Sequence, residues 1–464
     1  MSRPTLSRRL AALALATLTP LGAARATDIY SFEGIGAVSM GMGGTGVAHD
    51  IGGSAMIVNP ATLTARPDSY VDAGIKVAAP TGLEAAQTAT GEKARGKDTF
   101  PFHSYYVPQG GLVWRKDTVA VGAGVYAQGG FGTDYGHHSF LSRVPSGVNT
   151  GLRQGSEAMF LRAPLAVAWD ATPELTVAGA VDYVRAGMGV RLLQGADQLG
   201  ALIAQGRLTG AGALLPTAAP IIGAGGGIQL DIFDPSIVRS GLEGNGVSGR
   251  LGATWKVRPD TTIGAFYQFR TALEDLTGDG RVVVVSPTGA QLAAAAKYTL
   301  RDFQLPAEFG FGITHSPIPE LTLAFDYRRA QWSQVMKNFN VRVDVPGLGT
   351  VWETLPQHYN DINIFAVGAA YRVTEALTLR AGFRWAGKAA PDQDFLAIVP
   401  VTIRNHLGLG AGYAISEALR MDAAYSHGFQ ACVNNGTPPN GSAVNPGRFC
   451  NGTDIVALNL TARF

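Results

Sequence analysis

The sequence has little charge, few cysteines and no long apolar helix. Asp, Glu, Lys and Arg make up 16% of the 464 residues, against about 25% in a typical soluble protein. A formal net charge of +2 is too small for a protein whose main partner is nucleic acid. Two cysteines exclude a disulfide-rich scaffold or a multi-cysteine metal centre. The eight histidines lack metal-ligand spacing, so we expect neither a metal nor a cofactor.

The sequence also lacks a convincing membrane-spanning helix. A long uncharged stretch, residues 208–230, contains two prolines and six glycines and would form a poor helix. Residues 1–26 read as a signal peptide: Arg8 and Arg9 precede an apolar stretch, and Ala24-Arg25-Ala26 has the form of a cleavage site. The apolar stretch is short for an N-terminal membrane anchor. An exported chain without a spanning helix leaves two options, a secreted all-β protein or an outer-membrane β-barrel.

What the sequence has in abundance is alternation and glycine, with 60 glycines in all. In residues 174–184, for example, Val177, Val181 and Tyr183 share one face, opposite Thr176 and Asp182, as expected for a strand between two environments. Fourteen such strands are predicted, at residues 69–79, 105–115, 118–131, 157–169, 174–190, 241–257, 261–271, 300–315, 320–331, 360–372, 376–386, 401–415, 418–429 and 453–464. Short connections alternate with long ones, which is typical of an outer-membrane barrel with periplasmic turns and outer loops.

Both ends of the mature chain support this interpretation. The last strand ends in the aromatic residue Phe464, with Val456, Leu458 and Leu460 on the same face. Before the first strand, residues 27–68 are rich in glycine and are not patterned as a strand. Since a barrel of about fourteen strands has a wide lumen, this segment is expected to fold into it. The predicted organisation is a signal peptide (1–26), a plug (27–68) and an antiparallel transmembrane β-barrel (69–464).

The order and spacing of several motifs resemble the FadL family of outer-membrane transporters for long-chain fatty acids and other hydrophobic compounds. Residues 34–50 followed by Asn59-Pro60-Ala61 are similar to the family's N-terminal hatch with its NPA motif. Residues 121–135 resemble the family's third strand. Residues 305–334 and 360–384 resemble its eighth to eleventh strands. The resemblance is weakest in the long loops at 191–240 and 432–450.

The resemblance implies roles for particular residues. Asn59, Pro60 and Ala61 would pin the hatch against the wall, although the same residues also favour an ordinary turn. Gly129, Gly130 and Gly132 would mark a kink in the third strand that opens the wall sideways, because glycine in a strand often marks a bulge. Arg185 and Lys337 best match the family's basic contacts to a ligand carboxylate, although ion-paired arginines commonly line barrel lumens.

The long loops carry two further expectations. Cys432 and Cys450 lie in the last long loop, where an oxidising compartment favours a disulfide over two free thiols. In residues 191–240, Leu192, Leu193, Leu199, Leu202 and Ile203 fit one face of a short helix. An exposed apolar loop is costly in water unless it packs or binds something, so this loop either captures ligand or covers the barrel mouth.

The resulting hypothesis is a passive outer-membrane channel of a Gram-negative bacterium for long-chain fatty acids or similar hydrophobic compounds. It is expected to be a monomer in contact with lipid and lipopolysaccharide, without nucleic acid and without enzymatic activity. Four alternatives stay open: a channel of the same fold for hydrocarbons or aromatic compounds, an adhesin, a general porin, and an outer-membrane lipase or protease. A porin would need a more charged lumen, and an enzyme would need a nucleophile arrangement that the sequence does not show.

Overall fold

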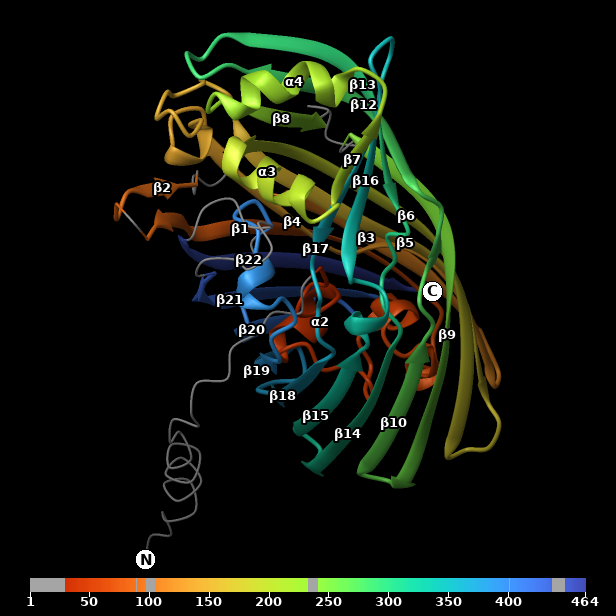
Figure 1. Ribbon diagram of the computed structural model, residues 1–464. Helices are drawn as coiled ribbons and strands as arrows, with labels where there is room; N and C mark the ends of the chain where they lie inside the picture. Colours follow the sequence, from red (N-terminus) through yellow and green to blue (C-terminus); the bar gives the residue numbers. More distant parts are fainter. Residues whose placement is uncertain (1–29, 89, 97–104, 233–240, 400, 436–446) are drawn as a thin grey trace, which may run out of the picture.

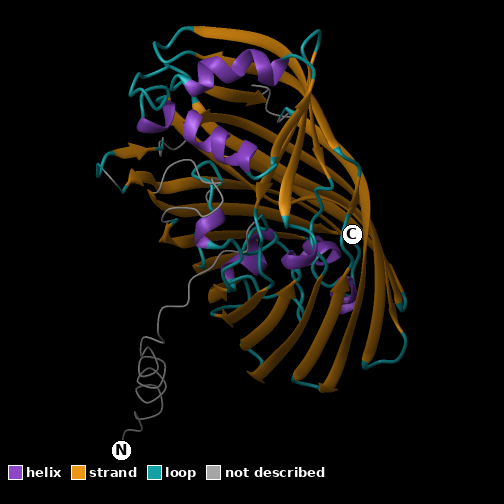
Figure 2. Cartoon of the chain, in the orientation of Figure 1, coloured by secondary structure: helices purple, strands orange, loops and turns teal. Residues whose placement is uncertain are grey.

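The computed structural model describes residues 30–88, 90–96, 105–232, 241–399, 401–435 and 447–464. The expected signal peptide lies outside these residues. Long strands wrap around a lumen, and the N-terminal segment, in red, lies among them (Figure 1). The expected all-β architecture is confirmed by the strands that dominate the chain, while its few helices are short (Figure 2). No helix in the described part is long and apolar enough to cross a membrane.

The wall consists of antiparallel strands that pair with their neighbours until the ring closes. Each ladder joins strands that are next to one another in the ring, and the last strand pairs with the first from Tyr70↔Arg463 to Gln87↔Gly447. In ring order, the strands are β1 (Tyr70–Gln87), β3 (Tyr105–Lys116), β4 (Val119–Gly136), β5 (Gln154–Asp170), β6 (Leu175–Gly195), β9 (Leu242–Arg258), β10 (Thr261–Gln268), β14 (Glu308–Ile318), β15 (Leu321–Ala330), β18 (Ile362–Arg372), β19 (Leu377–Ala386), β20 (Asn405–Ala414), β21 (Leu419–Asn434) and β22 (Gly447–Arg463).

The number of strands depends on the height at which the ring is followed. Near the short turns, β6 pairs directly with β9, from Leu175↔Trp255 to Met188↔Leu242. Farther out, β8 (Gly227–Ile232) pairs with β6, and β12 (Leu276–Val285) pairs with both β8 and β9. Followed through these insertions, the closed ring has sixteen strands among the described residues, so the expected count of fourteen differs by this outer pair.

Six more strands lie outside this ring, and several of them were not expected from the sequence. They are β2 (Lys93–Arg95), β7 (Leu208–Ala211), β11 (Ala272–Leu273), β13 (Gln291–Arg301), β16 (Asn338–Val345) and β17 (Gly349–Pro356). The helices α3 (Ala196–Ala204) and α4 (Leu214–Gly223) lie with β7, β8, β12 and β13 at the outer end of the barrel, where they form a cap (Figure 1). In the expected helical face, Leu199 and Leu202 are buried on α3, whereas Ile203 is exposed. Leu192 and Leu193 belong to β6 instead.

The burial pattern of the wall is inverted relative to a soluble protein. On β6, Val181 is 65% exposed and Tyr183 is 50% exposed, whereas Asp182 between them is fully buried. Asp182 forms an ion pair of 2.6 Å with the buried Arg162 of β5. Apolar residues on the outside and hydrogen-bonded charges on the inside are what a lipid-facing barrel requires. This pattern excludes the soluble sandwich.

The N-terminal segment, residues 30–69, contacts strands on several sides of the ring. It contains α2 (Gly36–Gly41) and two 3-10 turns, η1 (Gly52–Ile57) and η2 (Pro60–Ala65). The amide of Ala37 donates to Asn459 of β22, and the amide of Gly46 donates to Asp326 of β15. A segment that touches distant strands of one closed ring lies inside that ring, and Figure 1 shows it there.

Candidate functional site

The barrel wall has a gap between β3 and β4. The two strands pair from Lys116↔Val119 only as far as Gly110↔Val125. Beyond that point β3 continues on β1, up to Tyr105↔Ala78, while β4 continues on β5. Among the described residues, no ladder joins the outer part of β3 to the outer part of β4, and the wall is interrupted there.

The expected glycines lie at this gap. The β4–β5 register shifts between Ala127 and Gly129, and again near the outer end of β4, as expected for bulges that bend a strand. A Cβ on Gly129 would lie 1.7 Å from the carbonyl oxygen of Tyr30, and one on Gly132 would lie 1.4 Å from the Tyr105 hydroxyl. A Cβ on Gly130 would lie 2.3 Å from the oxygen of Ala158. These three positions of β4 thus require glycine, because Tyr30, Tyr105 and Ala158 approach the β4 backbone too closely for a side chain.

The start of the N-terminal segment packs against the bulge from the lumen side. The amide of Phe32 donates to the carbonyl oxygen of Gln128 at 2.9 Å, and the Gln128 side chain donates to the Ser31 hydroxyl at 3.3 Å. Tyr30 lies under this bulge, with its ring 5.1 Å from that of Phe131 and 5.3 Å from that of Trp332. Residues 30–32 therefore lie directly against the bulge of β4, and Ser31 and Phe32 line the space beside it.

A cavity of about 130 Å³ lies between this segment and the gap. Its lining combines the bulge of β4, the outer part of β3, residues of β1 and β22, and the loop before β20. Most lining side chains are apolar, including Phe32, Val107, Phe131 and Met159. No Lys or Arg is among the described residues that line it. Such a cavity suits a small apolar ligand better than an anion.

Asn59 fastens the N-terminal segment to the opposite wall. Its side-chain amide donates to Val47 O at 2.7 Å and to Ala253 O of β9 at 3.2 Å. Its Oδ1 accepts from Ala61 N at 3.1 Å, so the side chain also caps η2. Pro60 occupies the first position of η2, where its missing N–H costs nothing. The motif is buried and joins two parts of the segment to the wall.

Carboxylates hold the segment at further points. Asp326 accepts from Gly46 N and Val47 N at 2.8 and 3.1 Å. Within the segment, Asp50 forms an ion pair with Arg66 at 2.6 Å. Burial would raise the pKa of the Asp50 carboxyl, but the charge of Arg66 and the N–H of Gly52 outweigh burial, so its pKa is lowered. The carboxylate therefore stays ionised and paired at neutral pH.

The two expected carboxylate ligands lie away from the cavity. Arg185 has the same orientation on β6 as the exposed Val181 and Tyr183, and it pairs with Glu243 at 2.7 Å. It therefore faces outward, which does not fit the lumen position expected for it. Lys337 is exposed, and its carbonyl oxygen accepts from the amides of residues 357 and 358. Neither residue is among those that line the cavity.

Two features near the site were missed by the sequence reasoning. Residues 387–404 were expected as an outer loop leading into a strand from 401, but this segment folds inward. Its Phe395 stacks on Phe449 at 5.4 Å, and the carbonyl oxygen of Ile398 accepts from the Thr133 hydroxyl at 3.1 Å. Val401 and Ile403 line the cavity. The apolar run at residues 395–403 was the feature of the sequence that could have indicated this inward packing.

The second missed feature is an aromatic cluster, in which the rings of Phe131, Phe160 and Trp332 surround that of Tyr30.

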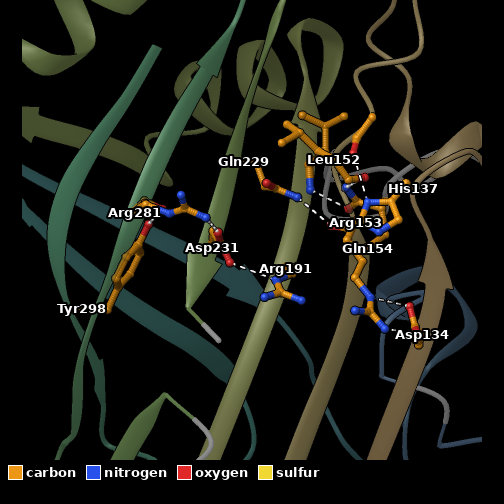
Figure 3. A network of polar contacts seen from close by, with 12 residues as sticks. Asp134, His137, Leu152, Arg153, Gln154, Arg191, Gln229, Asp231, Arg281 and Tyr298 are labelled. Carbon is orange, nitrogen blue, oxygen red and sulfur yellow. Dashed lines mark hydrogen bonds and ion pairs between the residues drawn. The ribbon is translucent and has the colours of Figure 1, made fainter. Parts of the chain in front are cut away.

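A polar network fixes the outer end of the wall beyond the gap (Figure 3). Asp231 of β8 pairs with Arg191 of β6 at 3.0 Å and with Arg281 of β12 at 2.6 Å. The Gln229 side chain donates to Arg153 O at 2.7 Å, and Arg153 pairs with Asp134 at the end of β4. The network thus ties the kinked β4 to the inserted strands.

The structure contains the disulfide between Cys432 and Cys450. The two residues face each other in the β21–β22 ladder, so the bond links the outer ends of these strands. Among the described residues there is no group of three or more His, Cys, Asp or Glu that could hold a metal.

A closed barrel with apolar residues outside, a folded segment inside and an apolar cavity at a gap in its wall defines an outer-membrane channel. A family model described as "Outer membrane protein transport protein (OMPP1/FadL/TodX)" matches residues 13–464. The chain belongs to this family of the outer membrane. Its family members and structural neighbours are transport channels, not enzymes.

Solved structures extend this similarity over nearly the whole chain. The Pseudomonas putida toluene transporter TodX is 31% identical with a TM-score of 0.83, over 93% of this chain and 99% of that one. The Ralstonia pickettii toluene transporter TbuX is 34% identical with a TM-score of 0.77, over 93% and 99%. The "47 kDa outer membrane protein" of Pasteurella multocida is 29% identical over 26% of this chain. The chain aligns with only 28% of that relative's length.

Proposed function

We propose that this protein is a passive channel for small neutral hydrophobic compounds, with monoaromatic hydrocarbons as the substrate class. The observation that carries the proposal is the cavity at the β3–β4 gap, which is mostly apolar and has no Lys or Arg among its described lining residues. A fatty acid would need a cation or several donors for its carboxylate. The cavity volume of about 130 Å³ is close to the ~150 Å³ of an engineered cavity that binds benzene.

The proposed route begins at the outer cap. Its exposed and half-buried isoleucines, such as Ile203 on α3 and Ile221 on α4, offer an apolar surface that a hydrophobic compound prefers to water. From there the compound enters the cavity and leaves sideways through the gap into the lipid. The segment 30–69 acts as a hatch that prevents direct passage to the periplasm. The channel works as a monomer surrounded by outer-membrane lipid and lipopolysaccharide.

Long-chain fatty acids are the second candidate. The observation in their favour is the membership of the FadL/TodX family. Their carboxylate would then have to bind somewhere other than Arg185, which is already paired with Glu243.

The test is uptake by cells that lack the protein, compared with the same cells expressing it. Labelled toluene and labelled oleate are supplied separately at low concentration. We expect faster toluene entry with the protein and little change for oleate. Equal toluene entry with and without the protein would refute the proposal, and faster oleate entry alone would favour the second candidate.

A further inference from the structure

Several polar side chains interrupt the apolar lining of the cavity, and Glu33 and His406 are the Glu and His among them. The route described above does not use either residue. Glu33, from the N-terminal segment, is 3% exposed, and His406, from β20, is 7% exposed. Both line the same cavity.

Both side chains have hydrogen-bonding capacity that the described residues do not satisfy. Glu33 Oε1 and His406 Nδ1 are buried without a hydrogen-bond partner there. An unsatisfied buried polar atom costs about 1–3 kcal/mol, and native proteins retain few of them. The simplest source of the missing partners is a molecule in the adjoining cavity.

The charges around Glu33 limit what that molecule can be. The Lys76 ammonium donates to the carbonyl oxygen of Gly34, next in the chain, at 2.5 Å. The Arg384 guanidinium donates to the carbonyl oxygen of Glu33 itself at 2.7 Å. The carboxylate therefore already has cations near it, and the ligand need not bring a positive charge. A ligand carboxylate would meet the negative charge of Glu33 directly.

A hydroxyl group on an aromatic ring fits these requirements. It donates one hydrogen bond, which Glu33 can accept, and it accepts another from whichever ring nitrogen of His406 carries the proton. The ring occupies the apolar remainder of the cavity. We propose that Glu33 and His406 form a hydrogen-bonding subsite that makes the channel prefer hydroxylated monoaromatic compounds to plain hydrocarbons of the same size. This inference rests on the proposed function and specifies its substrate class.

The test compares p-cresol with p-xylene, which have nearly the same shape and differ by a hydroxyl in place of a methyl group. Binding to the purified full-length protein in detergent is measured for both, with benzoate as the anionic probe. Since one hydrogen bond to a charged group contributes about 1.5–3 kcal/mol, we expect p-cresol to bind at least about tenfold more tightly than p-xylene. Benzoate should bind more weakly than either.

Substitutions test whether Glu33 and His406 cause the preference for p-cresol. His406→Leu and Glu33→Leu should each reduce the ratio of the two affinities to within about threefold while p-xylene affinity is kept. His406→Gln retains a donor and an acceptor and should restore most of the ratio. The matched controls are His315→Leu, whose half-buried histidine on β14 faces Asp260, and Glu320→Leu in a turn; both should leave the ratio unchanged. Heat-modifiable migration in gels checks that each variant is a folded barrel.

The outcomes separate this inference from the proposed function. Equal affinities of wild type for p-cresol and p-xylene would overturn the subsite and leave the hydrocarbon channel intact, with ordered water then satisfying the pair. A preference that survives both substitutions would also overturn it. Tighter binding of benzoate than of p-cresol would refute the neutral ligand. If none of the aromatic probes binds, the proposed function itself is refuted.

Discussion

Replacing Asn59 by alanine is expected to release the N-terminal segment from the barrel wall. The side chain is fully buried and takes part in three hydrogen bonds, to Val47 O, Ala253 O and Ala61 N. Truncation removes all three and leaves two carbonyl oxygens without this donor. At about 1 kcal/mol for each bond, the loss is about 3 kcal/mol of local stability.

Because the segment is held to the wall at several separate points, the loss should appear as local opening while the barrel stays folded. A change of about 3 kcal/mol corresponds to an opening equilibrium increased on the order of 100-fold. Hydrogen–deuterium exchange of the peptide covering residues 46–65 measures this directly. Entry of a small polar antibiotic into cells reports whether the opened segment also leaks.

Two variants test the reasoning. Asn59→Asp keeps the acceptor for Ala61 N but has no donor, so it should open the segment almost as much as alanine does. Asn245→Ala changes an exposed asparagine on the outer side of β9 and should leave the exchange of residues 46–65 as it is in wild type. If Asn59→Ala exchanges at the wild-type rate, the anchoring role assigned to this side chain is wrong.

Three further substitutions have defined outcomes. Gly129→Val forces a side chain into the space occupied by Tyr30 O, which typically costs about 1–3 kcal/mol; toluene uptake should fall while the barrel still folds, and normal uptake would contradict the close-approach argument. Replacing Cys432 and Cys450 by serine should lower stability by about 3 kcal/mol in the loop-entropy model for an 18-residue separation; unfolding by denaturant measures this, and no loss of stability would contradict it. Arg185→Ala should change toluene and oleate uptake by less than about twofold because the side chain lies outside the lumen; a large loss of oleate uptake would restore its assignment as a carboxylate ligand.

The alternation of the sequence predicted the wall well because lipid and lumen impose it on every strand. The expected strands at 105–115 and 376–386, for example, correspond to β3 and β19 within one residue at each end. The same alternation also predicts that Arg185 faces outward. Val181 and Tyr183 were assigned to the apolar face, and a residue two positions farther along a strand shares that face. The lumen position expected for Arg185 came from the family resemblance alone and did not take this two-residue period into account.

The outer cap was less predictable, since its strands pair with partners far away in the sequence. β12 and β13 were covered by an expected long connection at residues 272–299, although the run Val282 to Val285 is strongly β-forming. Its partner β8 comes from a segment that was read as an apolar loop. Neither segment forms a stable sheet alone, and local patterns do not say which distant segment supplies the neighbour.

The gap in the wall poses a physical problem that the N-terminal segment solves. An open strand edge at membrane depth leaves backbone groups without partners, which lipid cannot supply. At the bulge of β4, the carbonyl oxygen of Gln128 accepts from Phe32 N, so the segment provides a hydrogen bond that the missing strand neighbour does not. This arrangement requires the backbone of residues 30–32 to approach β4 closely, which only glycine at 129 permits. The scarcity of charge follows from the same design, because the wall faces lipid and the cavity at its gap is mostly apolar. Glu33 and His406 are therefore exceptions in this cavity, and the stability of the channel does not explain them. The comparison of p-cresol with p-xylene tests whether recognition of a hydroxylated substrate explains them.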